Sequence, residues 1–143
     1  MKKEKEIDKY QTDFVVIDTN VFLIDPNSVL SFQKSTIVVP LIVIEELDSF
    51  KREMNPTGKA AREVIRFLDE LRKIGKLTDG VQLENGGRLQ VSILDRTQQL
   101  PPGLDGNVKD NHILQVALRL KETKKSVLLV TKDADLRIKA DVL

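Results

Sequence analysis

The chain of 143 residues has no cysteine, no tryptophan and a single histidine, His112. Without cysteine it has no disulfide framework, no zinc–thiolate site and no thiol nucleophile. One histidine excludes any site that needs two. No apolar run approaches the roughly 20 residues that cross a bilayer, and no apolar region follows the charged start Met1–Glu6 as it would in a secretory signal. We therefore expect a cytoplasmic protein with no membrane anchor.

The chain also lacks an excess of either charge and has few aromatic residues. Its 23 basic and 22 acidic residues give a formal net charge of +1, and aromatics make up 4%. There is no overall attraction to nucleic acid, and a base-stacking platform is not expected. Any charged site must come from where the charges are placed. The length suits one domain, which we place at residues 13–143 behind a charged, mobile tail at residues 1–12.

Short apolar runs alternate with helical patterns along the chain. Continuous runs at residues 14–17, 37–39 and 127–130 are typical of parallel strands covered on both faces. Apolar residues at helical spacing predict helices over residues 41–50, 57–74, 110–123 and 133–140. The alternation indicates an α/β fold with a mostly parallel sheet. Two alternating segments around Asn85-Gly86-Gly87 predict a β-hairpin, inserted at about residues 81–93.

Four acidic residues are predicted to converge at one edge of this sheet. Ligands bind outside the carboxyl ends of the strands in such folds, and Asp18 and Asp133 follow the first and last apolar runs. At about 100° per residue, Glu46 lies roughly 60° from the centre of its helix's apolar face. Asp110 has the same placement in the first turn of a later helix, where the helix dipole favours an anion.

Such a cluster would need protons or cations. Two like charges 4 Å apart cost roughly 4 kcal/mol at an effective dielectric of 20, which is large beside a domain stability of about 5–15 kcal/mol. Oxygen ligands alone favour Mg²⁺ or Mn²⁺ over zinc or copper, and magnesium held by carboxylates is typical of phosphoryl chemistry.

Each acidic residue also has an ordinary explanation. Asp18 and Asp133 could be N-caps of the following elements, and Asp110 could be a first-turn residue favoured only by the helix dipole. Glu46 could be an ordinary helix residue. His112 falls at the margin of the apolar face of its helix and could be a surface residue. Only joint placement on one edge would favour a site.

Basic residues gather in and before the long helix. Lys59, Arg62 and Arg66 recur at helical spacing, and Lys51 and Arg52 precede them. They form a candidate track for RNA phosphates. The alternative is a solvated helix face whose charges are balanced by residues such as Glu63 and Glu70.

Taken in order, the acidic segments resemble the four motifs of PIN domains. The segments are Asp18-Thr19-Asn20, the stretch from Pro40 to Glu46-Leu47-Asp48, Asp110 followed by Ile113-Leu114, and Thr131 to Arg137. The hairpin and the residues of the first and last motifs are most similar to those of the PIN domain that precedes the ATPase in bacterial PhoH-like proteins.

The resemblance implies a three-layer α/β/α sandwich and a metal-dependent ribonuclease acting on single-stranded RNA with Mg²⁺ or Mn²⁺. Asp18, Glu46, Asp110 and Asp133 match the family's acidic quartet. Asp135 matches an auxiliary carboxylate, Thr131 a residue that orients a carboxylate or water, and Asn20 a polar neighbour of the first aspartate. The resemblance also implies a C-terminal ATPase domain as partner. This chain has no Gly-x-x-x-x-Gly-Lys phosphate loop of its own, so we expect it to be an N-terminal domain excised from a longer PhoH-like protein.

Two alternatives remain open at this point. One is an aspartyl-phosphate protein of the receiver or haloacid-dehalogenase kind, although the latter needs an aspartate where Asn20 stands. The other is a non-catalytic RNA-binding or oligomerisation module. The hairpin and exposed strand edges could also support a homo-oligomer.

Overall fold

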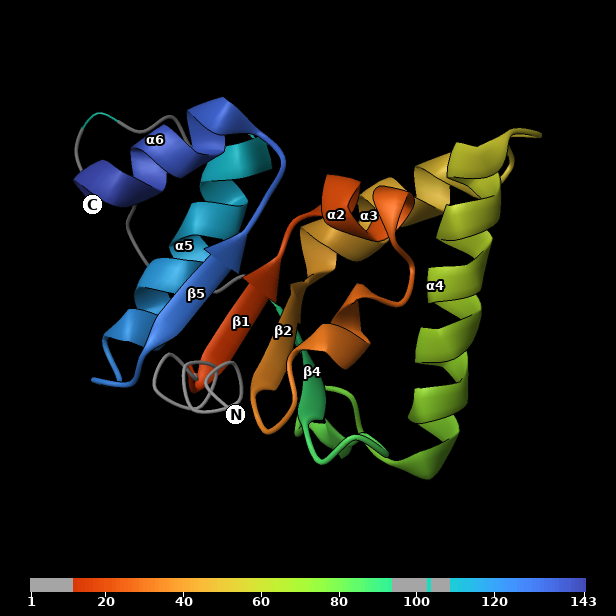
Figure 1. Ribbon diagram of the computed structural model, residues 1–143, viewed down its shortest axis with the longest axis horizontal. Helices are drawn as coiled ribbons and strands as arrows, with labels where there is room; N and C mark the ends of the chain where they lie inside the picture. Colours follow the sequence, from red (N-terminus) through yellow and green to blue (C-terminus); the bar gives the residue numbers. More distant parts are fainter. Residues whose placement is uncertain (1–11, 94–102, 104–108) are drawn as a thin grey trace, which may run out of the picture.

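Within the described residues, the central sheet has five strands in the order β3-β4-β2-β1-β5. Figure 1 labels four of them, β4, β2, β1 and β5, side by side. The computed structural model describes residues 12–93, 103 and 109–143; the predicted tail therefore lies almost wholly outside the described residues. The strands are β1 (Phe14–Ile17), β2 (Thr36–Pro40), β3 (Val81–Gln82), β4 (Arg88–Ser92) and β5 (Val127–Val130).

The three apolar runs do form neighbouring parallel strands. β1 pairs in parallel with both β2 and β5. Successive residues of β1 face opposite sides of the sheet, and Val15, Val16 and Ile17 are all fully buried. Helices therefore cover both faces of the sheet at its centre.

The predicted hairpin is confirmed, and it is also part of the main sheet. β3 and β4 are antiparallel, and Gly86 in the turn has a φ of 91°, which favours glycine. β4 also pairs in parallel with β2, with Pro40 opposite Ser92. The hairpin thus extends the sheet and is not a separate insertion.

In the described part of the chain, α-helices follow β1, β2, β4 and β5, and the last of them lies after the final strand. The predicted helices are confirmed with slightly shifted ends, as α3 (Leu41–Phe50), α4 (Pro56–Ile74), α5 (Lys109–Lys121) and α6 (Ala134–Val142). The sequence patterns missed α2 (Thr19–Ile24) and a 3₁₀ turn at Ser28–Ser31. Both are too short to show an apolar period.

The helices form the outer layers of a three-layer α/β/α sandwich. α5 packs against β1 and β5, while α2 and α3 both pack against α4. In Figure 1, α5 and α6 lie to the left of β1, and α4 lies to the right of α2 and α3. The expected fold class is therefore confirmed. Of the helices in the described ranges, none has the length and apolar character needed to span a membrane.

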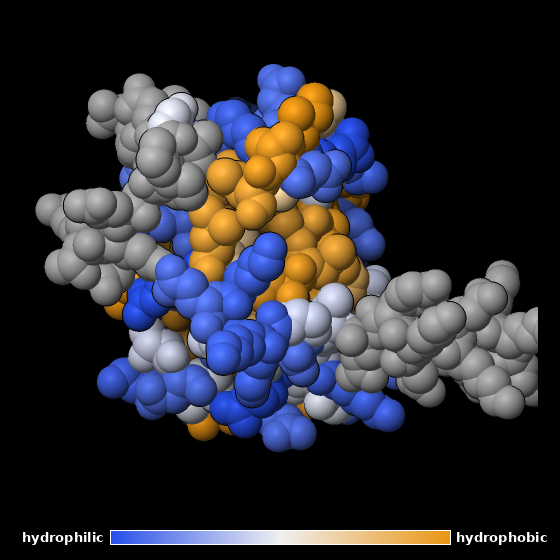
Figure 2. All heavy atoms as spheres, turned by 90° about the vertical axis from the view of Figure 1, so that its left-hand side faces the viewer, coloured by the Kyte–Doolittle hydropathy of each residue, from blue (hydrophilic) through white to orange (hydrophobic). Residues whose placement is uncertain are grey.

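The β5 edge is less covered than the centre of the sheet. Leu128 is 41% exposed, and a groove of about 600 Å³ runs between α5, β5 and α6. Figure 2 looks onto this side and shows apolar side chains gathered into one patch. The expectation that the run at residues 127–130 is buried on both faces is therefore wrong for β5, because the groove between α5 and α6 leaves this edge strand partly uncovered.

Candidate active site

Asp18 lies directly beyond β1 and is 4% exposed. Its Oδ1 accepts a hydrogen bond from the Thr19 backbone N–H at 2.7 Å, which caps α2. Its Oδ2 accepts a hydrogen bond from the Thr131 hydroxyl at 2.7 Å. These two bonds fix the orientation of a nearly buried carboxylate and compensate part of its desolvation.

Thr131 connects Asp18 to Asp133. The Asp18 N–H donates to the Val130 carbonyl at 3.0 Å, so β1 and β5 end side by side. The Thr131 hydroxyl oxygen then accepts from the Asp133 N–H at 3.0 Å. Asp133 in turn caps α6 by accepting from the Asp135 N–H at 2.9 Å. Asp18 and Asp133 are therefore both helix N-caps and neighbours at one edge of the sheet, so the two interpretations are compatible.

Asp110, in the first turn of α5, completes this group. Burial, a hydrogen bond with the Asp133 side chain and the negative charges of Asp133 and Asp18 raise the pKa of Asp110 to about 6. The same hydrogen bond is the main cause that lowers the pKa of Asp133. Two carboxyl groups can share a hydrogen bond only when one holds a proton. Above the raised pKa of Asp110 both groups are charged and repel each other, which favours a bound cation. We refer to Asp18, Asp110, Thr131 and Asp133 as the acidic edge.

Two residues near the acidic edge were not predicted. The Lys139 ammonium donates to the Asn111 side-chain oxygen at 3.1 Å, and its positive charge lowers the pKa of both Asp110 and Asp133. One signal could have found Lys139. It lies three residues after the fully buried Leu136, on the same face of α6. Asn111 has no comparable signal beyond its place beside Asp110.

The other predicted acidic and polar residues are less closely joined to this group. Glu46 is half-buried on α3. Asn20 is exposed on α2, and Asp135 is exposed in the first turn of α6. Within the described residues, the structure records no contact between the Glu46 carboxylate and the three aspartates.

Comparisons with known proteins identify the family of this chain. A family model for the PIN domain covers residues 15–143. The chain belongs to the PIN domain family. This PIN domain is 42% identical over 135 residues to protein PhoH2 of Bacillus subtilis, covering 90% of the chain and 30% of that protein. It is 39% identical over 128 residues to PhoH2 of Mycolicibacterium smegmatis, covering 87% and 29%.

The chain therefore spans about 30% of the length of these curated relatives. Among solved structures, a domain of a functionally unknown protein from Methanocaldococcus jannaschii has a TM-score of 0.54 at 21% identity. That match covers 91% of this chain and 85% of the other, and it supports the fold alone.

The acidic edge of this PIN domain suits a hard divalent cation. Among the residues that the structure describes, no three acidic or histidine side chains already stand close enough to hold a metal ion. Mg²⁺, however, is usually bound by one or two carboxylates, with waters and substrate phosphates as its other ligands. The hydrogen-bonded pair of Asp110 and Asp133 supplies that number, and its raised and lowered pKa values show a charge that a cation would neutralise.

The predicted basic residues divide into two groups. Arg62 donates through Nη1 to the Lys51 carbonyl at 2.7 Å and the Glu53 carbonyl at 3.0 Å, and so it fastens the connection between α3 and α4. The Lys51 ammonium pairs with Asp48 at 2.6 Å. Arg52, Lys59 and Arg66 are exposed. We refer to these five basic residues as the basic corner.

Proposed function

We propose that this PIN domain is a Mg²⁺- or Mn²⁺-dependent ribonuclease that hydrolyses phosphodiester bonds of single-stranded RNA. The observation that carries the proposal is the nearly buried Asp18, which Thr131 joins to Asp133 through two hydrogen bonds. Asp110 lies close enough for the charges of Asp133 and Asp18 to raise its pKa. Membership of a family of nucleases and the position at the carboxyl ends of the strands support the same conclusion.

Within this proposal Asp110 and Asp133 would hold the cation, and Asp18 and Glu46 would be further ligands that act directly or through water. A divalent ion bound there would supply an activated water and would stabilise negative charge on the leaving oxygen. Thr131 keeps the Asp18 carboxylate oriented, as its 2.7 Å hydrogen bond indicates. Asp135 is an auxiliary carboxylate, and Asn20 contributes a polar group beside Asp18. Water adds across the P–O bond, and no side chain forms a covalent intermediate.

RNA would be held mainly through its backbone. The exposed Arg52, Lys59 and Arg66 are available to phosphates. We also infer that the domain works within a longer protein that carries a C-terminal ATPase domain, as the resemblance to PhoH-like proteins implies.

Replacing Asp18 by asparagine tests the catalytic proposal. Asp18→Asn keeps the shape and an oxygen acceptor for Thr19 but removes the charge. We expect cleavage of single-stranded RNA in Mn²⁺ to fall by more than about 100-fold, beyond the loss typical of outer-shell partners. Asp79→Asn, which removes an exposed carboxylate next to the hairpin, should keep wild-type activity.

The other outcomes point to the alternatives. Unchanged cleavage in Asp18→Asn would contradict the nuclease proposal. RNA binding without cleavage in the wild type would favour a non-catalytic module, and a covalent phosphate on Asp18 would favour an aspartyl-phosphate protein.

A further inference from the structure

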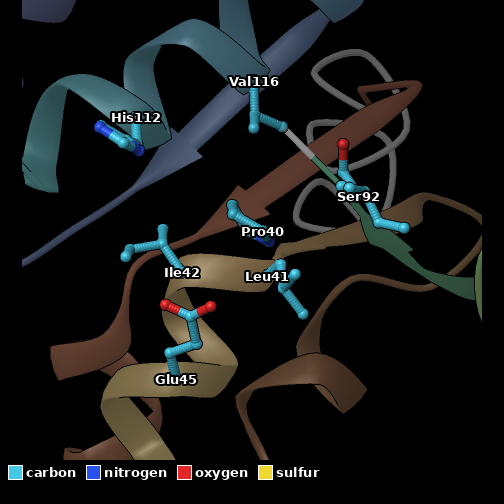
Figure 3. Close-up of a pocket in the computed structure, with 8 residues that line it drawn as sticks. Pro40, Leu41, Ile42, Glu45, Ser92, His112 and Val116 are labelled. Atoms are coloured by element: carbon cyan, nitrogen blue, oxygen red, sulfur yellow. The ribbon is translucent and has the colours of Figure 1, made fainter. Parts of the chain in front are cut away.

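A second hollow lies beside the acidic edge and has no role in the proposed hydrolysis. It is a pocket of about 290 Å³ at the carboxyl ends of β2 and β4, between α3 and α5. In Figure 3, Val116 points from α5 toward Leu41 and Ile42 at the start of α3. The full lining is Pro40, Leu41, Ile42, Glu45, Ser92, Ile93, His112 and Val116.

The elements that form the pocket also carry the acidic edge. β2 is the neighbour of β1, whose end carries Asp18. Adjacent strands are about 4.8 Å apart, so the pocket lies one to two strand widths from Asp18. His112 follows Asp110 by two residues on α5, and Glu45 precedes Glu46 on α3. A polymer bound at the acidic edge therefore has its next unit within reach of the pocket.

The size and lining of the pocket suit a single flat ring. Its volume is near the lower limit of the roughly 300–1,000 Å³ found for drug-sized ligands. Its walls are largely apolar, and Leu41 and Ile93 are 38% and 58% exposed. A ring stacked on these side chains would remove their apolar surface from water, which is favourable. Bases of single-stranded RNA are commonly splayed out and recognised through their faces and their hydrogen-bonding edges, and this pocket offers apolar contact for a face and polar groups for an edge.

The polar groups of the pocket favour particular bases. Among the described residues that line it, Glu45 is the one acidic side chain, and in Figure 3 its carboxylate is directed up from α3 toward Ile42. A carboxylate only accepts hydrogen bonds, so it matches a base with an exocyclic amino group, such as the N4 amino group of cytosine. Uracil alone among the RNA bases has no such group, and its carbonyl oxygens would face the negative charge.

We propose that this pocket binds the base next to the scissile phosphate and selects bases that carry an amino group over uracil, with Glu45 as the selecting residue. The inference rests on the proposed nuclease function for the position of the RNA, and it adds a specificity that the acidic edge alone does not supply. Ser92, which is half-buried at the end of β4, provides a hydroxyl for the acceptor atoms of the same base.

Cleavage of matched RNAs tests the selection. We compare an all-uracil strand with one that carries a single cytosine. Cleavage next to the cytosine should be at least about five-fold faster than at the corresponding uracil, the lower limit for one good base contact. Glu45→Gln should reduce the difference to less than about two-fold, because an amide offers a donor as well as an acceptor. The matched control Glu84→Gln, on an exposed residue of the hairpin turn, should keep the full preference.

A second measurement does not require cleavage. CMP and UMP differ in their base edges and contain no internucleotide bond, so they can be titrated in Mg²⁺ while the methyl NMR signals of Leu41, Ile42 and Val116 are followed. CMP should shift these signals at about five-fold lower concentration than UMP in the wild type, and Glu45→Gln should remove that advantage.

The two measurements separate the possible failures. Pocket signals that respond to CMP without any RNA cleavage would support the pocket and contradict the nuclease proposal. Cleavage with no base preference, or pocket signals that respond equally to both nucleotides or to neither, would overturn the base-pocket proposal and leave the nuclease proposal standing.

Discussion

The acidic edge and the basic corner carry opposite charges and are built in opposite ways. At the acidic edge, like charges are held together: Asp110 and Asp133 are hydrogen-bonded beside Asp18, and the pKa of Asp110 is raised to about 6. At the basic corner, each engaged charge has a local partner. Lys51, the C-cap of α3, pairs with Asp48 on that helix, and Arg62 bonds to two carbonyls.

This difference distinguishes charged residues that stabilise the fold from charged residues that call for a functional explanation. Local pairing at the basic corner stabilises a turn and needs no ligand. Crowded carboxylates destabilise the folded domain unless a proton or a cation joins them, so their presence needs a functional explanation. Perturbed electrostatics, more than the mere number of charged residues, identifies the site.

The first prediction tests the acidic edge by removing the hydrogen bond that orients Asp18. Thr131→Val keeps the shape of the side chain but removes the hydroxyl that bonds to Asp18 and Asp133. We expect a loss of about 1–3 kcal/mol in the free energy of unfolding, because a buried carboxylate loses a partner. RNA cleavage should fall roughly 10–100-fold, as for partners of metal ligands in other proteins.

The matched control is Thr131→Ser, which keeps the hydroxyl and should restore most of both properties. Chemical denaturation and cleavage rates in Mn²⁺ measure the two effects. Equal activity of the valine and serine variants would show that Thr131 has no positioning role.

The second prediction separates structural from exposed arginines in the basic corner. Arg62→Ala leaves the Lys51 and Glu53 carbonyls without their donor, and should lower the free energy of unfolding by about 1–2 kcal/mol. Arg66→Ala, one helical turn further along α4 and exposed, should change stability by less than about 0.5 kcal/mol.

RNA binding should respond in the opposite order. Arg66→Ala should weaken binding and reduce its salt dependence by about one unit of slope, as measured by anisotropy over a salt series. An Arg62→Ala variant as stable as the wild type would contradict the structural role of Arg62. An Arg66→Ala variant with the wild-type salt dependence would contradict a phosphate contact by Arg66.

Much of the fold could be predicted because its signals are local. The apolar runs, the helical spacings and the Asn85-Gly86-Gly87 turn each specify a nearby backbone conformation. The parallel pairing of β4 with β2 could not be predicted, because it joins segments that are far apart in the sequence. The partial exposure of β5 was missed for the same reason, since an apolar run does not show which strand lies at the edge.

The candidate site follows the same division. The strand-end rule places Asp18, Thr131 and Asp133 together, because parallel strands carry their carboxyl ends to one edge. The position of Lys139 beside Asp110 depends on how α5 and α6 pack, which no spacing within either helix determines. The pocket between α3 and α5 likewise exists only once two distant helices are placed on one sheet.

The smallest expected effect is also the most direct measure of the crowded charge. Because the folded domain raises the pKa of Asp110 from 3.8 to about 6, it binds that proton more tightly than the unfolded chain does. The resulting stabilisation is complete below pH 3.8 and is lost as the pH rises through 6. The contribution of Asp133, whose pKa is lowered, is lost only below its ordinary value of 3.8, outside a scan from pH 5 to 8.

We therefore expect the metal-free Tm to fall by a few degrees between pH 5 and pH 8, by an amount that is reduced because solvent screens a partly exposed group. Asp110→Asn should reduce the fall of Tm with pH and raise the metal-free Tm near pH 7.5. It should also abolish the stabilisation that Mg²⁺ gives the wild type by binding to the folded state. Asp79→Asn should behave like the wild type throughout. Differential scanning calorimetry with and without Mg²⁺ measures all three, and an unchanged pH slope in Asp110→Asn would mean that the aspartates do not compete for the same proton. In that case the carboxylates of the acidic edge would not be crowded, and the contrast in electrostatics with the basic corner would be lost.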